Sequence, residues 1–301
     1  MIKIAIIGGT GLLGSNLVKL FSSEHDVRAF SRIRSSNISD DLNTTVDFNY
    51  LETSLLRHFS EWKPNIIINA VAIVNLKECE NNYSMAHYIN CGIATQLSKI
   101  SAKLNAYFVH ISTDHYYNDG LKVHNESQHV VLLNNYAKTK YQAEIEVMQN
   151  YSNPLIVRTN IIGFRRRGAK SFFEWLLNGL AGDEALKLYT NYYTSPISVN
   201  QLGIIVLECF KKSLTGVYNI ASSEVISKHN FGIRTAKKFG FAASNIVGFS
   251  TLYGDNTELR RALTLGLDVT KIEKALNKNM PTIDDTLENL YFEYMEQNDG
   301  S

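Results

Sequence analysis

The feature that most constrains the fold of this chain is a glycine-rich turn close to its first residue. Ile2–Ile7 is apolar and β-prone, it leads directly into Gly8–Gly14, and the amphipathic stretch Leu12–Ser22 follows. A strand that turns at once into a helix needs residues without a Cβ wherever the backbone approaches itself or a ligand closely. The sequence therefore predicts a strand, a tight turn and a helix at the start of the fold.

The glycines of this turn have the spacing G-x-x-G-x-x-G, a variant of the dinucleotide-binding fingerprint. In such a turn backbone N–H groups approach a pyrophosphate, and the helix N-terminus favours its negative charge. Glycine-rich turns are common, so the spacing gains weight only from the strand before it and the helix after it. We predict NAD(P) binding with contacts at Gly8, Thr10, Gly11, Leu12, Leu13 and Gly14.

Short apolar runs alternate with amphipathic stretches up to residue 159, which is typical of a parallel sheet flanked by helices. We predict an α/β fold, a Rossmann-type doubly wound parallel sheet with a smaller C-terminal α/β substrate-binding lobe. Residues 1–163 would form the NAD(P)-binding domain and 164–301 mainly the lobe, with 192–220 packing back on the first domain. Strands are expected at 2–7, 27–30, 65–72, 106–112, 155–159 and 216–220, and helices at 12–22, 51–62, 84–104, 134–149, 171–180, 204–212, 271–276 and 283–295.

The end of the second predicted strand, Ala29-Phe30-Ser31-Arg32, indicates which dinucleotide binds. NAD-specific sites place an acidic residue near this point against the ribose 2′-hydroxyl, whereas an arginine accommodates the 2′-phosphate of NADP. Arg32, with Arg34 nearby, therefore favours NADPH, with NADH as the alternative; the other interpretation of Arg32 is an arginine in a solvated loop. Asp47, after the next strand, could bond the adenine amino group or be a surface aspartate.

Tyr136 and Lys140 are four residues apart on a predicted helix and therefore share one of its faces. An ammonium beside a phenol lowers the phenol pKa from about 10, so tyrosine can exchange a proton with a carbonyl or alcohol oxygen near neutral pH. The strand at 106–112 ends in Ser112-Thr113, where a hydroxyl would face the cofactor crevice and bond a substrate carbonyl. We expect a catalytic set here rather than an ordinary exposed helix pair.

The composition excludes several other classes of protein. The chain has 301 residues with 30 basic and 29 acidic side chains, a balance that attracts neither nucleic acid nor an anionic membrane. No apolar run approaches the roughly 18 residues that span a bilayer, and the N-terminal run is too short for a signal peptide. Cys79, Cys91 and Cys209 have neither metal nor disulfide-framework spacing, and His110 is interpreted as a histidine at the edge of the core. We expect a cytoplasmic protein without a metal site, either a monomer or a homodimer.

With these parts in order, the chain resembles the extended short-chain dehydrogenases/reductases, and within them the dTDP-4-dehydrorhamnose reductase-like branch. The likeness extends over nearly the whole chain. The segments that resemble the family are the glycine turn, Pro64–Ala72, Cys79-Glu80, Ile89-Asn90, Ile111–Asp114, Tyr136–Lys140 with Ala143-Glu144, Val157–Thr159 and Leu267–Ile272.

This resemblance implies a catalytic set of Thr113, Tyr136 and Lys140. Tyr136 would protonate a ketone oxygen, Lys140 would tune Tyr136 and bond the nicotinamide ribose, and Thr113 would hold the oxygen. Further cofactor contacts are implied at Ala70, Val71 and Ala72. The implied reaction is hydride transfer from NADPH or NADH to C4 of a nucleotide-linked 4-keto-6-deoxysugar, in the synthesis of a surface polysaccharide or glycan.

The chain departs from the family's pattern at two positions. Rhamnose reductases have a tryptophan two residues beyond the Arg-Thr pair, where it lines the substrate pocket, whereas Arg158-Thr159 is followed here by Asn160-Ile161. Their acidic residue after the Ala-x-Ala stretch is Lys77 in this chain. The loss of an aromatic platform predicts a different sugar or nucleotide, so we do not expect the rhamnose reductase itself. Arg165–Arg167 is a basic cluster that could contact a diphosphate; the alternative is that these arginines lie in a solvated loop.

Two other functions use the same scaffold. An epimerase or dehydratase would retain its NAD through the reaction cycle instead of consuming NADPH. A non-catalytic NAD(P)-binding regulatory subunit would not need the tyrosine and lysine in register, and fold alone does not decide between these functions. The sequence favours the reductase and leaves the sugar, the nucleotide and the stereochemistry open.

Overall fold

The computed structural model describes residues 1–34, 38–117, 120, 122–165, 169–250 and 260–298, and the chain forms two compact units. Unit 1 comprises Met1–Thr113, Asn134–Arg158 and Val206–Tyr218, and unit 2 comprises Asp114–Leu133, Thr159–Ile205 and Asn219–Ser301. The two units therefore interleave along the sequence: Val206–Tyr218 belongs to unit 1, within the range 192–220 that we expected to pack back on the first domain. The roles expected for the two parts, cofactor binding and substrate binding, stay predictions.

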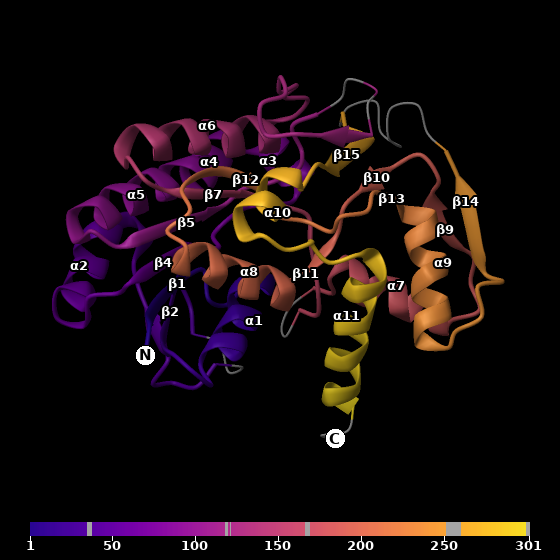
Figure 1. Cartoon of the computed structure of the whole chain (residues 1–301), viewed down its shortest axis with the longest axis horizontal. Coiled ribbons are helices and arrows are strands. Elements are labelled where there is room, and N and C mark those ends of the chain that lie inside the picture. Colours follow the sequence, from indigo (N-terminus) through magenta and orange to yellow (C-terminus); the bar gives the residue numbers. More distant parts are fainter. Residues whose placement is uncertain (35–37, 118–119, 121, 166–168, 251–259, 299–301) are drawn as a thin grey trace. The chain divides into compact units, whose positions relative to one another are not determined.

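Unit 1 is built on a seven-stranded sheet with the order β12-β7-β5-β4-β1-β2-β3 (Figure 1). Every neighbouring pair from β7 to β3 is parallel, which confirms the predicted doubly wound α/β fold. The order reverses between β1 and β4, and ligands of such sheets bind beyond the strand C-termini at this switch point. The strands are β1 (Lys3–Ile7), β2 (Asp26–Ser31), β3 (Asn43–Thr45), β4 (Ile66–Asn69), β5 (Tyr107–Ile111), β7 (Leu155–Arg158) and β12 (Gly216–Asn219).

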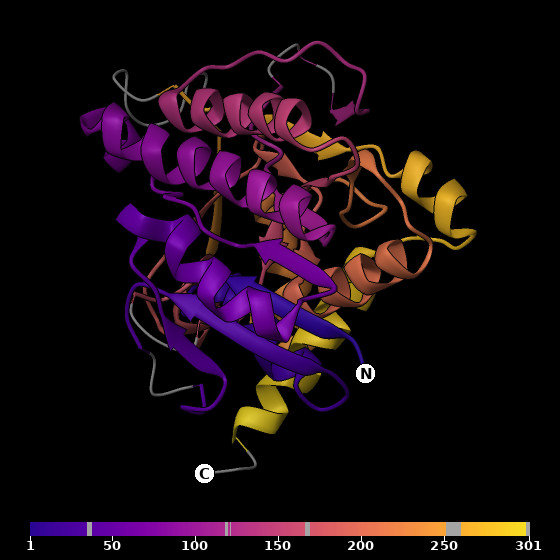
Figure 2. The same cartoon turned by 90° about the vertical axis from the view of Figure 1, so that its left-hand side faces the viewer.

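Helices α2 (Leu51–Trp62), α5 (Ile93–Leu104) and α6 (Asn135–Asn150) lie side by side over one face of this sheet (Figure 2). Their apolar residues recur every three or four positions, as in α2 with Leu51, Leu55, Phe59 and Trp62, and they form one core with the strands below. Helix α1 (Leu12–Phe21) packs against β1 and β2. The shorter elements are η1 (Phe48–Tyr50), α3 (Leu76–Asn81), α4 (Tyr83–His87) and the π-helix η2 (Tyr88–Gly92), and α8 (Val199–Lys211) extends from unit 2 into unit 1.

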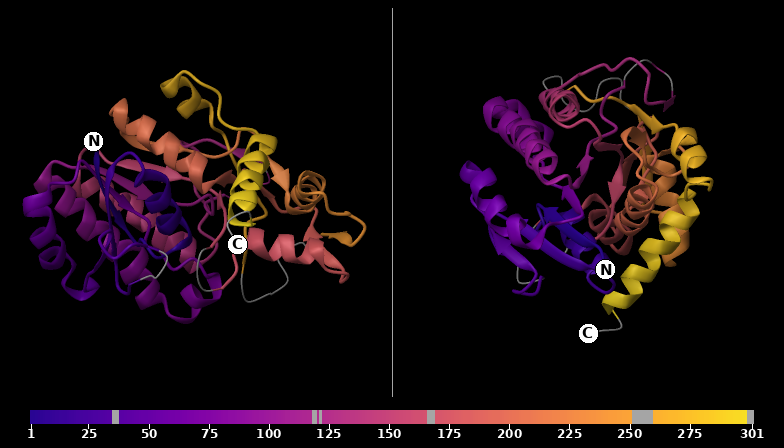
Figure 3. Two further views of the ribbon diagram at one scale, coloured as in Figure 1. Left: turned by 90° about the horizontal axis from the view of Figure 1, so that it is seen from below. Right: turned by 60° about the vertical axis from the view of Figure 1, so that its left-hand side comes forward.

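Unit 2 contains a four-stranded sheet with the order β13-β10-β15-β6 and the two parallel pairs β8–β11 and β9–β14. Helices α7 and α9 pack beside β9 and β14 around a second apolar core (Figure 3). The elements are β6 (Val123–His124), β8 (Ile161–Ile162), α7 (Phe172–Ala181), β9 (Leu186–Tyr189), β10 (Tyr193–Thr194), β11 (Ile197–Ser198), β13 (Ile226–Ser227), α9 (Lys228–Phe239), β14 (Ile246–Phe249), β15 (Thr264–Leu267), α10 (Thr270–Leu276) and α11 (Ile283–Asn298).

Helix α9 is the longest element that the sequence analysis did not predict. Its sequence has few apolar residues and an internal glycine, Gly232, which lowers helix propensity. Local and tertiary contacts form the helix nevertheless: Ser227 caps its first turn, and Gly240 ends it in the left-handed conformation. A Cβ on Gly232 would lie 2.3 Å from Leu188 Cδ1, so the glycine permits close packing against β9. Packing therefore outweighs propensity at this helix.

Across the described ranges, none of the helices is both long and apolar enough to cross a membrane.

Candidate functional site

The glycine turn joins β1 to α1, and its backbone is packed too closely to admit side chains. Gly8 has a φ of +92°, in the left-handed region. A Cβ on Gly14 would lie 2.3 Å from the carbonyl oxygen of Gly8, and one on Gly9 would lie 2.5 Å from Ala29 Cβ. Gly11 is the N-cap of α1, and within the described structure no side chain caps this helix end. The first backbone N–H groups of α1 can therefore meet an anion such as a pyrophosphate.

The stretch Ala70–Ala72 follows β4 and lies directly against this turn. The Ala70 N–H donates to the carbonyl of Ile7 at 2.9 Å, and a Cβ on Gly8 would lie 3.0 Å from Val71 Cγ2. The structure thus brings together two segments that are some sixty residues apart in the sequence and that we predicted to bind the same cofactor.

Arg32 and Asp47 line one pocket of about 620 Å³ in unit 1, together with apolar and aromatic side chains that include Phe48, Met85 and Tyr88. A cationic residue, a carboxylate and flat apolar surface in one cavity fit an adenosine that carries a 2′-phosphate. With Ser31 in place of an acidic residue, the end of β2 presents no carboxylate that would repel this phosphate.

Arg34 and Asp47 each have a partner within the protein, which bears on their proposed contacts with the cofactor. Arg34 pairs with Asp40 at 3.2 Å, and both side chains are largely exposed, so Arg32 is the better candidate for the phosphate. Asp47 accepts a hydrogen bond from the Asn49 N–H at 2.9 Å as the N-cap of η1. Its carboxylate therefore has a structural role in addition to its place in the pocket. Together, the glycine cradle and this pocket fit a bound NADP.

Thr113, Tyr136 and Lys140 come from the end of β5 and the first turns of α6, and all three are buried. The Lys140 Nζ donates to the carbonyl of Ile111 at 2.7 Å, which fixes α6 to the strand two residues before Thr113. Burial lowers the pKa of Lys140 to about 8, although the negative charge of Glu144 opposes this shift. The predicted catalytic residues thus all belong to unit 1, and one of them is a buried lysine that can lose its proton near neutral pH.

Ser112, the alternative to Thr113, has a different partner. Its hydroxyl donates to Glu144 Oε1 at 2.6 Å. Glu144 in turn accepts hydrogen bonds from both Nε and Nη2 of the Arg158 guanidinium, with Arg158 Nη2 to Glu144 Oε2 at 2.7 Å. Because both charged side chains are buried, this pair is a fixed part of the interior. Ser112 is thereby directed into the interior, and Thr113 is the hydroxyl we retain as the candidate.

Three polar residues to which the sequence analysis assigned no role in the site lie near this set. Asn69, at the end of β4, and His110, in β5, are neighbours in the sheet, and their side chains contact each other. Asn90, in η2, accepts from the Ile73 N–H at 2.7 Å and donates to Thr139 Oγ1 at 3.0 Å. A π-helical turn is frequent at functional sites. Nothing in the spacing of these residues distinguishes them from ordinary interior asparagine and histidine.

Unit 2 contains a buried carboxyl group, Asp114, directly after Thr113 in the chain, and a partly buried lysine, Lys228. Asp114 is buried and accepts from Asn160 Nδ2 at 2.6 Å; burial raises its pKa. Lys228 lies 4.2 Å from the centroid of the Phe172 ring, and burial lowers its pKa to about 8 while Asp114 opposes the shift. The basic cluster Arg165–Arg167 is described only at Arg165, since 166 and 167 lie outside the described residues.

The chain is similar to several known proteins. A family model described as the RmlD substrate binding domain matches residues 2–295. The probable low-salt glycan biosynthesis reductase Agl14 of Haloferax volcanii is 23% identical over 94% of this chain and 95% of its own length. The methionine adenosyltransferase 2 subunit beta of Xenopus laevis is 23% identical over 81% of this chain and 74% of its own. Among solved structures, dTDP-4-dehydrorhamnose reductase from Bacillus anthracis str. Ames in complex with NADP has a TM-score of 0.82 at 21% identity, over 97% of this chain and 100% of that one.

Proposed function

Because the chain belongs to the RmlD substrate binding domain family, we propose that it is an NADPH-dependent reductase that acts on the keto group of a nucleotide-linked 4-keto-6-deoxysugar. The observation that supports this most directly is the burial of Lys140, which lowers its pKa to about 8. Lys140 shares a face of α6 with Tyr136 and donates to the carbonyl two residues before Thr113. The name of the archaeal relative, a glycan biosynthesis reductase, supports a role in building a surface polysaccharide or glycan.

In this proposal NADPH, when bound, supplies the hydride that adds to the carbonyl carbon. The pyrophosphate would be held by the N–H groups at the start of α1, and the 2′-phosphate by Arg32. Tyr136 transfers its phenolic proton to the ketone oxygen, which becomes the alcohol, and Lys140 stabilises the phenolate that remains. Thr113 donates a hydrogen bond to the same oxygen while it gains negative charge. A proton from solvent then restores the phenol.

The main alternative is a regulatory subunit, and the name of the Xenopus relative, a subunit of a methionine adenosyltransferase, favours it. A purely regulatory chain does not need a tyrosine and a buried lysine on one face of a helix. Here Tyr136 and Lys140 share a face of α6, although burial of Lys140 costs stability. Rhamnose reductases have a tryptophan two residues beyond the Arg-Thr pair, whereas this chain has Asn160-Ile161 after that pair. The identity of the sugar therefore stays open.

The test follows NADPH oxidation by absorbance with a panel of nucleotide-linked 4-keto-6-deoxysugars. We expect turnover with at least one of them and its loss in Tyr136→Phe, by at least about a hundredfold, the usual size of a general-acid contribution. Tyr141→Phe, on the same helix outside the proposed set, is the matched control and should keep its activity. NADPH binding without turnover of any sugar would move the assignment to the regulatory subunit, and tightly retained NAD without net oxidation of NADPH to the epimerase or dehydratase.

A further inference from the structure

His110 makes two polar contacts that packing in the core alone would not require. It lies in β5, is completely buried, and its two ring nitrogens face two different polar partners. Burial and the nearby Lys140 charge hold the pKa of His110 well below its usual value of 6.5. The ring is therefore neutral at physiological pH and has one N–H, whose position depends on its partners.

Asn69 determines which ring nitrogen has the proton. Its side-chain oxygen accepts from the Val71 N–H at 3.1 Å, so its amide nitrogen is the atom that faces the ring. That nitrogen lies 3.1 Å from His110 Nδ1. An amide nitrogen only donates, so Nδ1 must accept, and the single proton of the neutral ring is placed on Nε2.

His110 Nε2 lies 3.4 Å from Lys140 Nζ. A charged ammonium group has no lone pair, so it cannot accept a hydrogen bond from the Nε2–H, and the two donors oppose each other. A neutral amine has a lone pair and can accept from the Nε2–H. The other groups around Lys140 act differently. The Ile111 carbonyl accepts from it, and the carboxylate of Glu144 on the same helix favours its charge. Cys91, on η2, has a thiol pKa raised by burial and is therefore neutral, and Tyr136 lies one turn earlier on α6.

We propose that His110 is a positioning residue which, through a tautomer fixed by Asn69, favours the neutral form of Lys140. The role in catalysis rests on the proposed reductase function. The contacts form a continuous path from the Val71 N–H through the buried side chains of Asn69 and His110 to Lys140. The path joins the stretch that we propose to contact the cofactor to the lysine that we propose to tune Tyr136.

Two amide substitutions separate the two sides of the ring. In His110→Gln the side-chain nitrogen replaces Nε2 and keeps a donor toward Lys140, whereas in His110→Asn the side chain reaches only the Nδ1 position and keeps the contact with Asn69. Reduction should fail at high pH when Lys140 becomes neutral and no longer stabilises the phenolate. In His110→Asn this alkaline limb of kcat/KM should move upward by about one pH unit, the effect of losing a hydrogen bond to one protonation state.

His110→Gln should keep the limb near its wild-type position, which is the conservative rescue. A purely structural role for His110 predicts the opposite order, because His110→Asn keeps the bond that joins β5 to β4. Thermal unfolding and NADPH binding of both variants show whether they fold. A limb that stays in place in His110→Asn, or moves equally in His110→Gln, would overturn the proposal.

A second readout needs neither substrate nor turnover. The ¹⁵N chemical shifts of the imidazole nitrogens report which nitrogen is protonated, and the His110 signals are those missing in His110→Gln. We expect a neutral ring with its proton on Nε2 at neutral and at mildly alkaline pH. A proton on Nδ1, or on both nitrogens, would refute the proposal even in an active reductase. The expected tautomer in a protein that reduces no sugar would leave the effect of His110 on Lys140 standing and reject only the reductase function.

Discussion

Lys140 is a buried amine whose charge costs the folded protein stability. Its side chain is 2% exposed, and burial lowers its pKa to about 8. A lysine in the unfolded chain titrates near 10.4. Below pH 8 both states are protonated and the cost is fully present; between pH 8 and about 10.4 the unfolded state binds more protons, so stability rises with pH.

We predict that Lys140→Met is more stable than the wild type at pH 7 although it is inactive. Removing the buried charge should add roughly 3 kcal/mol to the free energy of unfolding, less about 1 kcal/mol for the lost hydrogen bond to the Ile111 carbonyl. Urea unfolding at pH 7 and at pH 10 measures both the gain and its decrease as pH rises. Lys138→Met, exposed on the same helix, is the control and should change stability little. A Lys140→Met variant less stable than the wild type at pH 7 would contradict the prediction.

Arg32 is the residue on which the preference for NADPH depends. If its guanidinium binds the 2′-phosphate, Arg32→Ala loses a charge-assisted hydrogen bond, and NADPH should bind about 10- to 100-fold more weakly. NADH has no 2′-phosphate, so its affinity should remain unchanged. Fluorescence titration with both cofactors measures the ratio, and Arg34→Ala, which loses only the exposed pair with Asp40, is the matched control. Equal losses for NADPH and NADH would assign Arg32 a structural role instead.

The buried pair of Glu144 and Arg158 joins α6 to β7, and Ser112 adds the end of β5 to the same group. Two charges removed from water stabilise a fold little by their mutual attraction, yet loss of one leaves the other uncompensated in the interior. The pair therefore positions the helix that bears Tyr136 and Lys140 at a fixed place on the sheet.

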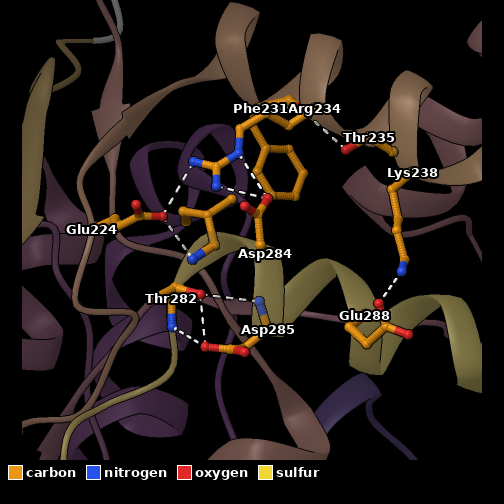
Figure 4. A network of polar contacts seen from close by, with 10 residues as sticks. Glu224, Phe231, Arg234, Thr235, Lys238, Thr282, Asp284, Asp285 and Glu288 are labelled. Carbon is orange, nitrogen blue, oxygen red and sulfur yellow. Dashed lines mark hydrogen bonds and ion pairs between the residues drawn. The ribbon is translucent and has the colours of Figure 1, made fainter.

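Glu144→Gln should lower the free energy of unfolding by about 3–5 kcal/mol, because it leaves Arg158 buried without a counter-charge. The matched control is Glu288→Gln. Figure 4 shows Glu288 of α11 paired with Lys238 of α9, and this pair is partly exposed. An exposed pair contributes at most about 1 kcal/mol. Chemical denaturation of both variants measures the difference, and similar losses at the two positions would show that burial of the Glu144 pair does not matter.

The elements that the sequence predicted are those with a local signal. Helix α2 begins and ends where its apolar spacing and Pro64 indicated, and the glycine turn lies between β1 and α1 as expected. Helix α9 and the two-residue strands of unit 2 have no such periodicity, because partners far away in the sequence form them. The candidate site divides in the same way. The position of Tyr136 and Lys140 after the strand that ends at Ser112 pointed to them. The contact of Asn69 with His110 arises only when β4 and β5 become neighbours.

Because the two units interleave along the sequence, neither is a continuous piece of chain. Unit 1 needs Val206–Tyr218, which follows a long passage of the chain through unit 2. In unit 1 the ring of Tyr107 lies 5.3 Å from that of Phe210, and its hydroxyl donates to the Leu214 carbonyl. The Gly216 N–H donates to the Pro154 carbonyl at 2.7 Å, next to β7.

A fragment that ends at residue 163 should therefore not fold as an independent NADPH-binding domain. Without residues 206–218 it loses β12, so β7 becomes an open sheet edge, and the Tyr107 ring and the apolar surface beneath Phe210 are exposed to water. We expect a broad, non-cooperative thermal transition by circular dichroism and no protection by NADPH. Coexpression with a second fragment, residues 164–301, should restore a cooperative transition and protection by NADPH. That result would show that the fragment 1–163 fails because a segment is missing and not because it is damaged. A sharp, NADPH-dependent transition in the fragment 1–163 alone would show that the cofactor domain is continuous in sequence after all.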